Sequence, residues 1–345
     1  MSCCGAAATL LPVTPYEQLT AAGKLRRLHA LAEAAIAHYG LDEPRLQFHA
    51  AKTNAHYRVT TRQGQRLILR VGRPGWRTLN DLESEAMWLD ALARDTDIGA
   101  PEIIRTRDGK PTLELELAGG GGVRQVTLMT RVPGRGLGRY LSAPNLERMG
   151  ALFATLHHHG KEWTPPVGFT DRRFEHWLSR GEANTLLSGA ALDRLTTPQR
   201  GLVLRLHDHV ETAYRRIDRA DLRVIHCDLW HGNINLHHGA LHPFDFEDTL
   251  NGFRAHDIAM AMLDLLEQTD DETYAGLLLA FRRGYEALLP WPDDPIEPLQ
   301  AGRILWKMNY VAGIYPNRLP QMVQWYEAVL LAYERTGRIG KPQAG

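Results

Sequence analysis

Two carboxylates and one amide follow short apolar segments in the middle of the chain. Asp228 comes three positions after the apolar pair Val224 and Ile225, and Asn233 stands five residues further on. Asp245 follows a second apolar segment that ends in Phe244. A carboxylate can position or deprotonate a hydroxyl group, and carboxylate and amide oxygens are ligands that Mg²⁺ accepts. This combination of side chains is what phosphoryl transfer from a nucleotide to a hydroxyl requires.

The spacing of these residues is that of a known catalytic loop. His226, Asp228 and Asn233 reproduce the H-x-D-x-x-x-x-N pattern of kinases, and Asp245-Phe246-Glu247 stands where kinases have the metal-binding D-F-G. In this interpretation Asp228 is the catalytic residue, while Asn233 and Asp245 hold the metal. On the Asp–Asn spacing alone, a turn residue and a cap would be the simpler explanation. The longer match, with strands in the expected places, favours the catalytic interpretation.

The chain resembles the aminoglycoside phosphotransferase and choline kinase-like family, whose signature reads roughly H-G-D-x-H-x-x-N followed by I-D-F/W-E/D. The resemblance covers residues 45–290 and is nearest to the homoserine kinase II and RdoA-type kinases. It implies ATP and Mg²⁺ as cofactors, and transfer of the γ-phosphoryl group of ATP to a hydroxyl. By resemblance, His226 and Asp257 support the catalytic loop. Two departures, Cys227 in place of Gly and Trp230 before His231, are expected to shape the pocket.

The resemblance also assigns residues before position 100. Arg70, in a strand-like apolar run, stands where the family has its phosphate-binding basic residue, and its expected partner is Glu85, with Glu83 as the alternative. Arg keeps the charge and offers a fork to phosphate or carboxylate. Asn54 matches the family's N-x-x-Y pattern in the expected phosphate-covering loop, and Lys52 is a further candidate there.

The segment joining the two expected lobes resembles the kinase hinge. Its backbone would pair with the adenine edge, and the candidate residues are Met129, Thr130, Arg131 and Val132. Since any residue type supplies backbone donors, the assignment rests on position.

The acceptor is less closely defined. Asp257 follows Asp245 after only twelve positions, which leaves no room for a long activation segment and favours a small-molecule hydroxyl compound, aminoglycoside-, choline- or homoserine-like. The alternatives are an RdoA-like protein Ser/Thr kinase and a non-catalytic, nucleotide-binding regulatory pseudokinase. The candidate acceptor-site residues, each of which could equally be helix surface or core, are Asp264, Glu267, Trp306, Asn309 and Tyr310.

The expected elements position these residues. Alternating and helical hydrophobic patterns predict helices over 25–39 and 79–94, the second with Asn80 as its cap, and strands over 46–49, 56–60, 66–71, 102–106, 112–117 and 123–130. After residue 134, helices are predicted over 143–158, 198–216, 255–266, 272–288, 296–311 and 320–333. Short strands over 223–226, 234–237 and 241–246 interrupt them. Together with the resemblance, these elements give an α+β, bilobal protein-kinase-like fold, with a small antiparallel-sheet N-lobe and a larger, mainly helical C-lobe.

We expect an N-terminal tail over 1–24, the N-lobe over 25–133 and the C-lobe over 134–345, with ATP held by both lobes.

The formal net charge of zero argues against nucleic acid as a partner, and no apolar run is long enough to span a membrane. Three cysteines, two of them adjacent at Cys3 and Cys4, imply no disulfide framework and fit a reducing cytoplasm. The oligomeric state is left open.

Three other features suggest sites, but each is better explained in another way. The glycine run 119–122 lies between two strands with no helix after it, which is typical of a hairpin rather than a phosphate loop. The run His157-His158-His159 ends a helix, where such side chains usually bond to the last carbonyls. A zinc site at His226, Cys227 and His231 lacks the paired cysteines that would complete it.

Overall fold

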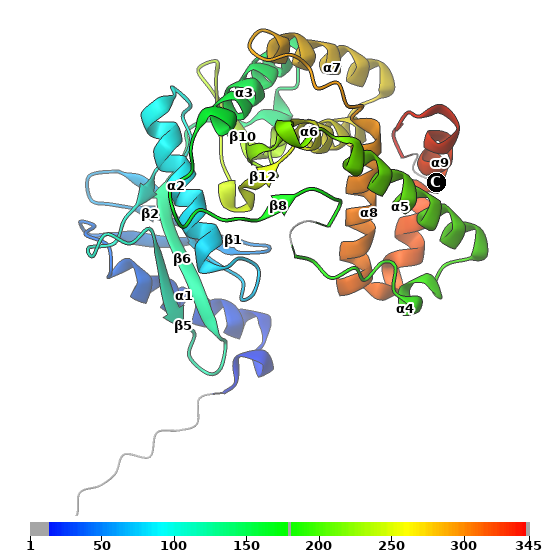
Figure 1. The fold of residues 1–345 in the computed structure, drawn as a ribbon. Coiled ribbons are helices and arrows are strands. Elements are labelled where there is room, and N and C mark those ends of the chain that lie inside the picture. The colour runs from blue at the N-terminus through cyan, green and yellow to red at the C-terminus, as the bar shows by residue number, and fades with distance from the viewer. Residues whose placement is uncertain (1–13, 179–180, 343–345) are drawn as a thin grey trace, which may run out of the picture. The chain divides into compact units, whose positions relative to one another are not determined.

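The structure, a computed structural model, describes residues 14–178 and 181–342, so Cys3 and Cys4 lie outside the described residues. The chain divides into two compact units (Figure 1). Unit 1 takes its residues from Met1–Ala86 and Glu102–Arg131, and unit 2 from Met87–Pro101 and Val132–Gly345. The division cuts one helix, α2 (Leu79–Asp95), between Ala86 and Met87.

Unit 1 is built on an antiparallel sheet with the order β1-β2-β3-β6-β4, in which β5 also pairs with β6. Its strands are β1 (Arg45–Ala51), β2 (Ala55–Thr60), β3 (Arg66–Val71), β4 (Ile103–Ile104), β5 (Thr112–Glu116) and β6 (Val123–Thr130). Successive side chains of β3 point to opposite faces of the sheet. Leu67, Leu69 and Val71 are buried in one core, and Arg70 points to the opposite face.

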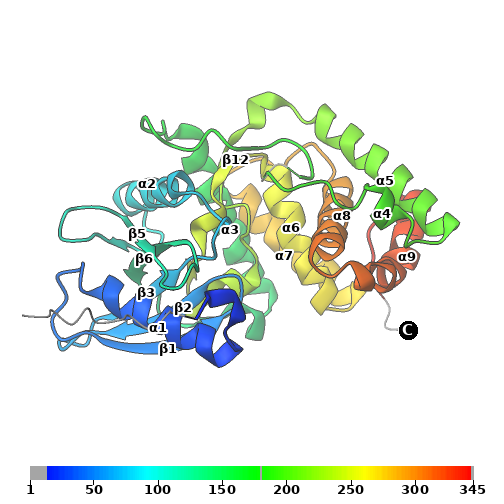
Figure 2. The same cartoon turned by 90° about the horizontal axis from the view of Figure 1, so that it is seen from below.

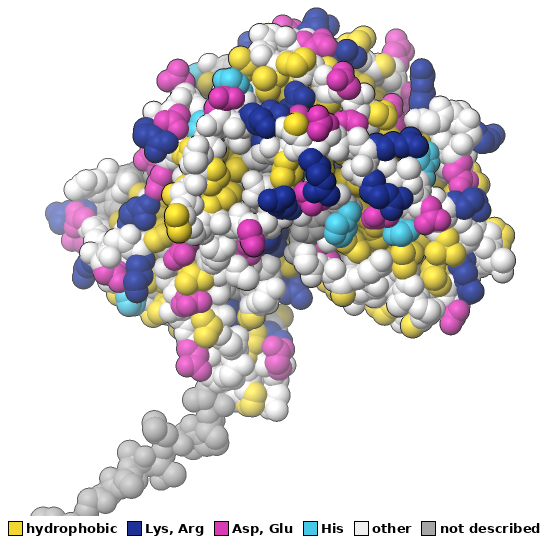
Figure 3. Space-filling view, viewed as in Figure 1, with side chains coloured by type: hydrophobic (Ala, Val, Ile, Leu, Met, Phe, Trp, Pro, Cys, Tyr) yellow, Lys and Arg dark blue, Asp and Glu magenta, His cyan; other side chains and the backbone are white. Residues whose placement is uncertain are grey.

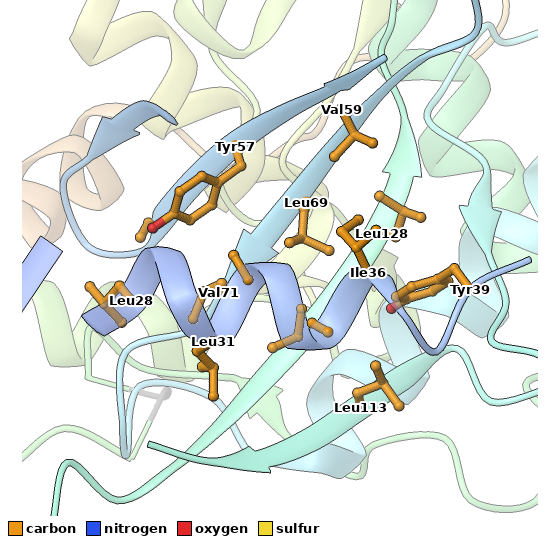
Figure 4. Close-up of a cluster of buried hydrophobic side chains, with 14 of the residues drawn as sticks. Leu28, Leu31, Ile36, Tyr39, Tyr57, Val59, Leu69, Val71, Leu113 and Leu128 are labelled. Carbon is orange, nitrogen blue, oxygen red and sulfur yellow. The ribbon is translucent and has the colours of Figure 1, made fainter. Parts of the chain in front are cut away.

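Helix α1 (Ala21–Ile36) covers the apolar face of this sheet (Figures 1 and 2). Figure 4 shows Leu31 and Ile36 of α1 lying against Leu69 and Val71 of β3. Burying side chains of this size stabilises a protein by about 1.5–3 kcal/mol each. The apolar pattern of the helix therefore fixes which of its faces meets the sheet.

Helix α1 begins earlier than position 25, where the sequence analysis placed its start. Thr20 caps it by accepting a hydrogen bond from the Gly23 backbone N–H at 3.1 Å. Upstream of the cap, Tyr16 in the 3₁₀ turn η1 (Tyr16–Gln18) is buried in the α1 core. The expected tail over 1–24 thus ends in structured residues.

Helix α2 is capped by Thr78 rather than by Asn80, so that prediction was wrong. The Thr78 N–H donates to Asp81 Oδ2 at 2.9 Å, and the Asp81 N–H donates to Thr78 Oγ1 at 3.2 Å. This reciprocal pair satisfies two N–H groups at the start of the helix that would otherwise lack partners.

Unit 2 is mainly helical and contains two small sheets with the orders β11-β10-β7 and β8-β12-β9. Its helices are α3 (Ala143–Glu162), α4 (Gly189–Leu192), α5 (Thr197–Arg216), α6 (Arg254–Gln268), α7 (Asp271–Glu286), α8 (Glu297–Ile314) and α9 (Leu319–Thr336). Its strands are β7 (Arg135–Gly136), β8 (Arg173–Phe174), β9 (Arg223–Ile225), β10 (Ile234–His237), β11 (Ala240–Pro243) and β12 (Leu250–Gly252).

Helices α3 and α7 pack backbone to backbone (Figure 1). A methyl group added at Gly150 of α3 would overlap the carbonyl oxygen of Phe281, and one at Gly284 of α7 would overlap that of Glu147. Only glycine allows this close approach.

The helices among residues 14–178 and 181–342 are all too short or too polar to cross a membrane.

On the face drawn in Figure 3, Lys and Arg side chains (dark blue) lie among Asp and Glu side chains (magenta).

Candidate active site

The β10–β11 hairpin brings the predicted metal ligands together. Ile234 pairs with Pro243, and the Phe244 N–H donates to the Asn233 carbonyl at 2.9 Å. Asn233 therefore lies opposite Phe244, and Asp245 is the next residue along the chain. The register of one hairpin thus sets the separation between the two candidate ligands.

The Asn233 side chain also holds Asp228. Its Nδ2 donates to the Asp228 backbone carbonyl at 2.8 Å and to the Asp228 carboxylate oxygen Oδ2 at 3.1 Å. Because both bonds use the amide nitrogen, the amide oxygen Oδ1 is the atom left to offer to a cation. The pair can therefore orient the carboxylate on one side and ligate a metal on the other.

His226 links Asp228 to Phe244, which follows the β10–β11 hairpin. The Asp228 N–H donates to His226 Nδ1 at 3.3 Å, and His226 Nε2 donates to the Phe244 carbonyl at 3.2 Å. Burial lowers the pKa of His226 below its usual value, which favours the neutral ring that this bonding pattern needs. His226 is therefore placed to support the backbone at Asp228.

Asp257, near the start of α6, supports the loop from another side. Its Oδ1 accepts a hydrogen bond from the Cys227 N–H at 2.9 Å, and its Oδ2 accepts one from His157 Nε2 at 3.1 Å. His157 Nδ1 in turn lies 3.0 Å from the Tyr285 hydroxyl. Cys227 has a φ of +65°, a conformation that glycine adopts most easily, so the Asp257 bond holds a strained position immediately before Asp228.

The histidine run at the end of α3 does more than the sequence analysis expected. His157 bonds to Asp257 rather than to helix-end carbonyls. His159 accepts a hydrogen bond from Trp88 Nε1 at 3.1 Å and donates to Asp95 at 3.1 Å. The assignment of this run to carbonyl capping was wrong, because α3 continues to Glu162 and places both rings in the interior of unit 2.

Asp245 itself has a left-handed backbone, with a φ of +69°, and it begins the 3₁₀ turn η5 (Phe246–Asp248). Such a conformation is uncommon for a residue other than glycine and is often found at functional sites. The Phe246 ring fixes the turn by packing against His226 at 4.3 Å and Trp88 at 5.5 Å, measured between ring centroids.

The donors in this segment fit Mg²⁺ rather than a softer metal. Asn233 and Asp245 supply hard oxygen atoms, and Mg²⁺ is commonly held by one or two carboxylates together with substrate phosphates. Across residues 14–178 and 181–342, no group of three or more His, Cys, Asp or Glu side chains is arranged to hold a metal by itself. A metal at this place would therefore take its remaining ligands from water or from phosphate oxygens.

In unit 1, Arg70 pairs with Glu85 and not with Glu83. Arg70 Nη1 donates to Glu85 Oε1 at 3.0 Å, and Nη2 donates to Oε2 as well. The side chains are 4% and 1% exposed, so the bidentate pair is buried. Strand β3 and the first half of α2 are thereby joined by an ion pair, in the arrangement that the family resemblance implies.

Asn54 and Lys52 occupy the turn between β1 and β2. The buried Asn54 Oδ1 accepts a hydrogen bond from the Arg73 N–H at 3.1 Å, and the Lys52 N–H donates to the Asn54 carbonyl at 3.1 Å. Lys52 is exposed and, with Lys24, Arg73 and Arg124, lines a cavity of about 590 Å³. The Asn54 side chain therefore shapes the turn itself.

The expected hinge lies at the end of β6. The Thr130 N–H donates to the Glu102 carbonyl at 2.9 Å and the Arg131 N–H to the Arg66 carbonyl at 3.0 Å, while Met129 pairs with Ile68 in the sheet. The N–H groups of Thr130 and Arg131 are thus engaged. Val132, whose N–H donates to no other residue in the described part of the chain, is the candidate left for a donor to adenine.

The predicted acceptor carboxylates form one cluster. Asp264 and Glu267, both on α6, share Lys307 of α8 at 3.4 Å and 2.7 Å. The Tyr326 hydroxyl donates to Glu267 at 2.7 Å, and burial with these carboxylates raises the Tyr326 pKa far above its usual value. Two carboxylates therefore face one ammonium group.

The other three predicted acceptor residues lie on α8. Asn309 accepts hydrogen bonds from the N–H groups of Thr185 and Leu186, each at 2.8 Å, and donates to the Ala183 carbonyl, so it holds a loop. Trp306 Nε1 donates to Glu182 at 2.8 Å. Tyr310 stacks on Trp306 with ring centroids 5.8 Å apart and is partly exposed.

Arg303 of α8 is a residue that the sequence analysis missed. Its Nη2 lies 3.7 Å from Asp228 Oδ1, and its guanidinium lies 4.3 Å from the centre of the Trp306 ring. No motif marks Arg303, because 75 residues separate it from Asp228 and it stands in a largely apolar helix. The spacing of Arg303 and Trp306, one helical turn apart, is the only local signal.

Comparison with known proteins places this geometry in a family. The family described as phosphotransferase enzyme family matches residues 44–291, which is most of the chain. An uncharacterized protein of Deinococcus radiodurans is 28% identical over 295 residues, which cover 82% of each chain.

Two solved structures share the fold over nearly their whole length. A microcompartment-associated aminopropanol kinase is 20% identical, with a TM-score of 0.73, over 89% of this chain and 98% of its own. An amicoumacin kinase in complex with AMP-PNP and Ca²⁺ is 17% identical, with a TM-score of 0.74, over 90% and 96%. The expected protein-kinase-like fold is thereby confirmed, and the chain belongs to the phosphotransferase enzyme family.

Proposed function

We propose that this chain is an ATP- and Mg²⁺-dependent phosphotransferase that moves the γ-phosphoryl group to a hydroxyl of a small molecule. The observation that carries the proposal is the arrangement of Asp228, Asn233 and Asp245. The Asn233 amide nitrogen orients the Asp228 carboxylate, and the backbone bond from Phe244 to Asn233 places Asp245 one residue beyond the position opposite Asn233. Membership of the phosphotransferase family supports it.

In the proposed reaction Asp228 accepts the hydrogen bond of the acceptor hydroxyl and takes its proton as the hydroxyl oxygen bonds to the γ-phosphorus of ATP. The bond from that phosphorus to the β–γ bridging oxygen breaks, and ADP leaves. Asn233 and Asp245 hold the metal, which when bound neutralises charge on the phosphates. Within unit 1, Glu85 holds Arg70 in place, and the family resemblance makes Arg70 the basic residue proposed to bind phosphate. His226 and Asp257 keep the loop in the geometry that this proton transfer needs.

A small-molecule acceptor is supported by the segment between Asp245 and Asp257. It holds only η5, β12 and the start of α6, and so no long segment for docking a protein substrate. The solved relatives include kinases of aminopropanol and amicoumacin. The carboxylates Asp264 and Glu267 outnumber Lys307 by one, which leaves a negative charge for an acceptor that carries an amine.

The proposal is tested first by binding and then by turnover. Calorimetry should detect Mg²⁺–AMP-PNP binding to the wild-type protein, and Asp245→Ala should weaken it by about tenfold or more, whereas Asp208→Ala, at an exposed carboxylate on α5, should not. ADP release is then measured with 1-amino-2-propanol, choline, homoserine, kanamycin, sugar alcohols and casein. Binding without acceptor-dependent ADP release would favour the regulatory pseudokinase, and release with casein alone would favour a protein kinase.

A further inference from the structure

The carboxylate of Asp228 is held from two sides, and the two contacts differ in kind. Asn233 Nδ2 makes a hydrogen bond of 3.1 Å to Oδ2, while Arg303 Nη2 approaches Oδ1 only to 3.7 Å. A separation of 3.7 Å exceeds the length of an N–H···O hydrogen bond. Oδ1 therefore keeps its capacity to accept a hydrogen bond while it lies beside a positive charge, and it is the oxygen suited to the acceptor hydroxyl.

The guanidinium of Arg303 is itself held in place. It lies over the Trp306 ring at 4.3 Å, a cation–π contact, and the side chain is only 12% exposed. Trp306 is fixed in turn by the bond from its Nε1 to Glu182 and by stacking on Tyr310. The orientation of Arg303 is thus set by α8 and not by Asp228 alone.

Further along α8, Asn309 fixes the helix to the loop that carries Glu182. It accepts the N–H groups of Thr185 and Leu186 and donates to the Ala183 carbonyl. Three of the five residues that the sequence analysis assigned to the acceptor, Trp306, Asn309 and Tyr310, therefore stabilise the loop and ring that hold Arg303.

Arg303 also has unused bonding capacity. Its Nε is buried and has no hydrogen-bond partner among the described residues, and Nη2 is too far from Asp228 for a strong bond. A buried donor without a partner is costly, so the contacts of Arg303 Nε do not account for its placement beside Asp228.

We propose that Arg303 is a positioning residue for Asp228, which keeps Oδ1 of the catalytic carboxylate directed toward the acceptor hydroxyl. This inference rests on the proposed phosphotransferase function. Its physical basis is that a fixed cation restricts the rotation of a nearby carboxylate without occupying the oxygen that must accept the proton.

Three substitutions test the inference. Arg303→Met removes the charge and keeps most of the stem, Arg303→Lys keeps the charge, and Arg205→Met removes a comparable Arg–carboxylate pair, with Glu334, from the surface. With the fastest acceptor of the screen above, Arg303→Met should lower kcat about tenfold or more and leave Mg²⁺–AMP-PNP affinity unchanged. Arg303→Lys should recover most of the loss, and Arg205→Met should match the wild type.

A double-mutant cycle separates positioning from a general structural effect. In the Asp228→Asn background, Arg303→Met should change kcat by less than about twofold, because its effect is exerted through the carboxylate. An equal loss in both backgrounds, or unchanged kcat in Arg303→Met alone, would overturn the inference. Thermal melting confirms that each variant is folded.

A second readout does not depend on turnover, so failure of the proposed function and of this inference can be told apart. The side-chain amide NMR signals of Asn233 report its bond to Asp228. They should shift in Arg303→Met and stay in place in Arg205→Met. Unchanged Asn233 signals in Arg303→Met would refute the positioning role even if the wild type released no ADP.

Discussion

The buried pair of Arg70 and Glu85 allows a quantitative test of how unit 1 is held together. Its side chains are 4% and 1% exposed and make two parallel hydrogen bonds, one of them at 3.0 Å. At this separation the Coulomb attraction is about 5.5 kcal/mol for an effective dielectric constant near 20, and much of it is offset by the desolvation of both charges. Removing one partner leaves the other charge buried and unpaired.

We therefore expect Glu85→Gln to lower the free energy of unfolding by about 3–5 kcal/mol. The double variant Arg70→Met/Glu85→Leu, which buries no charge, should recover most of that loss, because an apolar pair of similar volume avoids the desolvation cost. Both variants should lose affinity for Mg²⁺–AMP-PNP, since the cation proposed to face the phosphates is displaced or absent.

Urea unfolding followed by circular dichroism and tryptophan fluorescence measures the loss, with Lys110→Met at an exposed pair with Asp108 as the control. A Glu85→Gln variant within about 1 kcal/mol of the wild type would refute the reasoning, as would a double variant no more stable than the single one.

Two further predictions concern unit 2. Burial lowers the pKa of His157 and of His226. Below the ordinary histidine pKa near 6.5, the unfolded chain therefore binds more protons than the native one. The free energy of unfolding should fall as the pH drops from 7.5 to 5.5, by up to about 1.4 kcal/mol per pH unit for each ring. Urea unfolding at these pH values should show a shallower dependence for His157→Gln than for the exposed control His158→Gln, and equal slopes would contradict the assignment. Gly150→Ala should lower the free energy of unfolding by about 1–3 kcal/mol because the added methyl group meets the Phe281 carbonyl, whereas Gly276→Ala, with open space around it, should be neutral or stabilising. Urea unfolding measures both variants, and equal stability of the two would contradict the close contact.

The sequence analysis located the strands well where alternation was strong. The ranges 66–71, 123–130 and 234–237 agree with the structure at both ends. In the first of these, buried leucines lie on one face and Arg70 on the other, whereas the pairing of Arg70 with Glu85 was expected from the family resemblance, with Glu83 as the alternative. Local patterns of this kind carry their own register.

Elements were placed less well where a side chain bonds to the backbone a few residues away. Helix α1 starts at Ala21 because Thr20 accepts the Gly23 N–H, but a glycine in the first turn argues against a helix on propensity alone. Likewise, Thr78 and Asp81 cap α2 together, and the intervening Asn80 is the stronger single-residue candidate for a cap.

The surroundings of the proposed acceptor residues were the hardest to predict because they depend on contacts between residues far apart in the sequence. Asp264 and Glu267 were expected as candidates for the acceptor site, but their shared partner Lys307, which lies on α8, was not. Nothing near Arg303 marks its approach to Asp228. Such pairs follow from the packing of helices, which hydrophobic periodicity alone does not specify.

The central claim is that Asp228 accepts the proton of the acceptor hydroxyl during transfer of the γ-phosphoryl group. The most direct measurement is single-turnover phosphoryl transfer from ATP with saturating Mg²⁺ and the fastest acceptor, compared between the wild type and Asp228→Asn. We expect a rate lower by about a hundredfold or more in Asp228→Asn, with nucleotide affinity preserved. A variant that folds, binds nucleotide and transfers phosphate at the wild-type rate would contradict this claim.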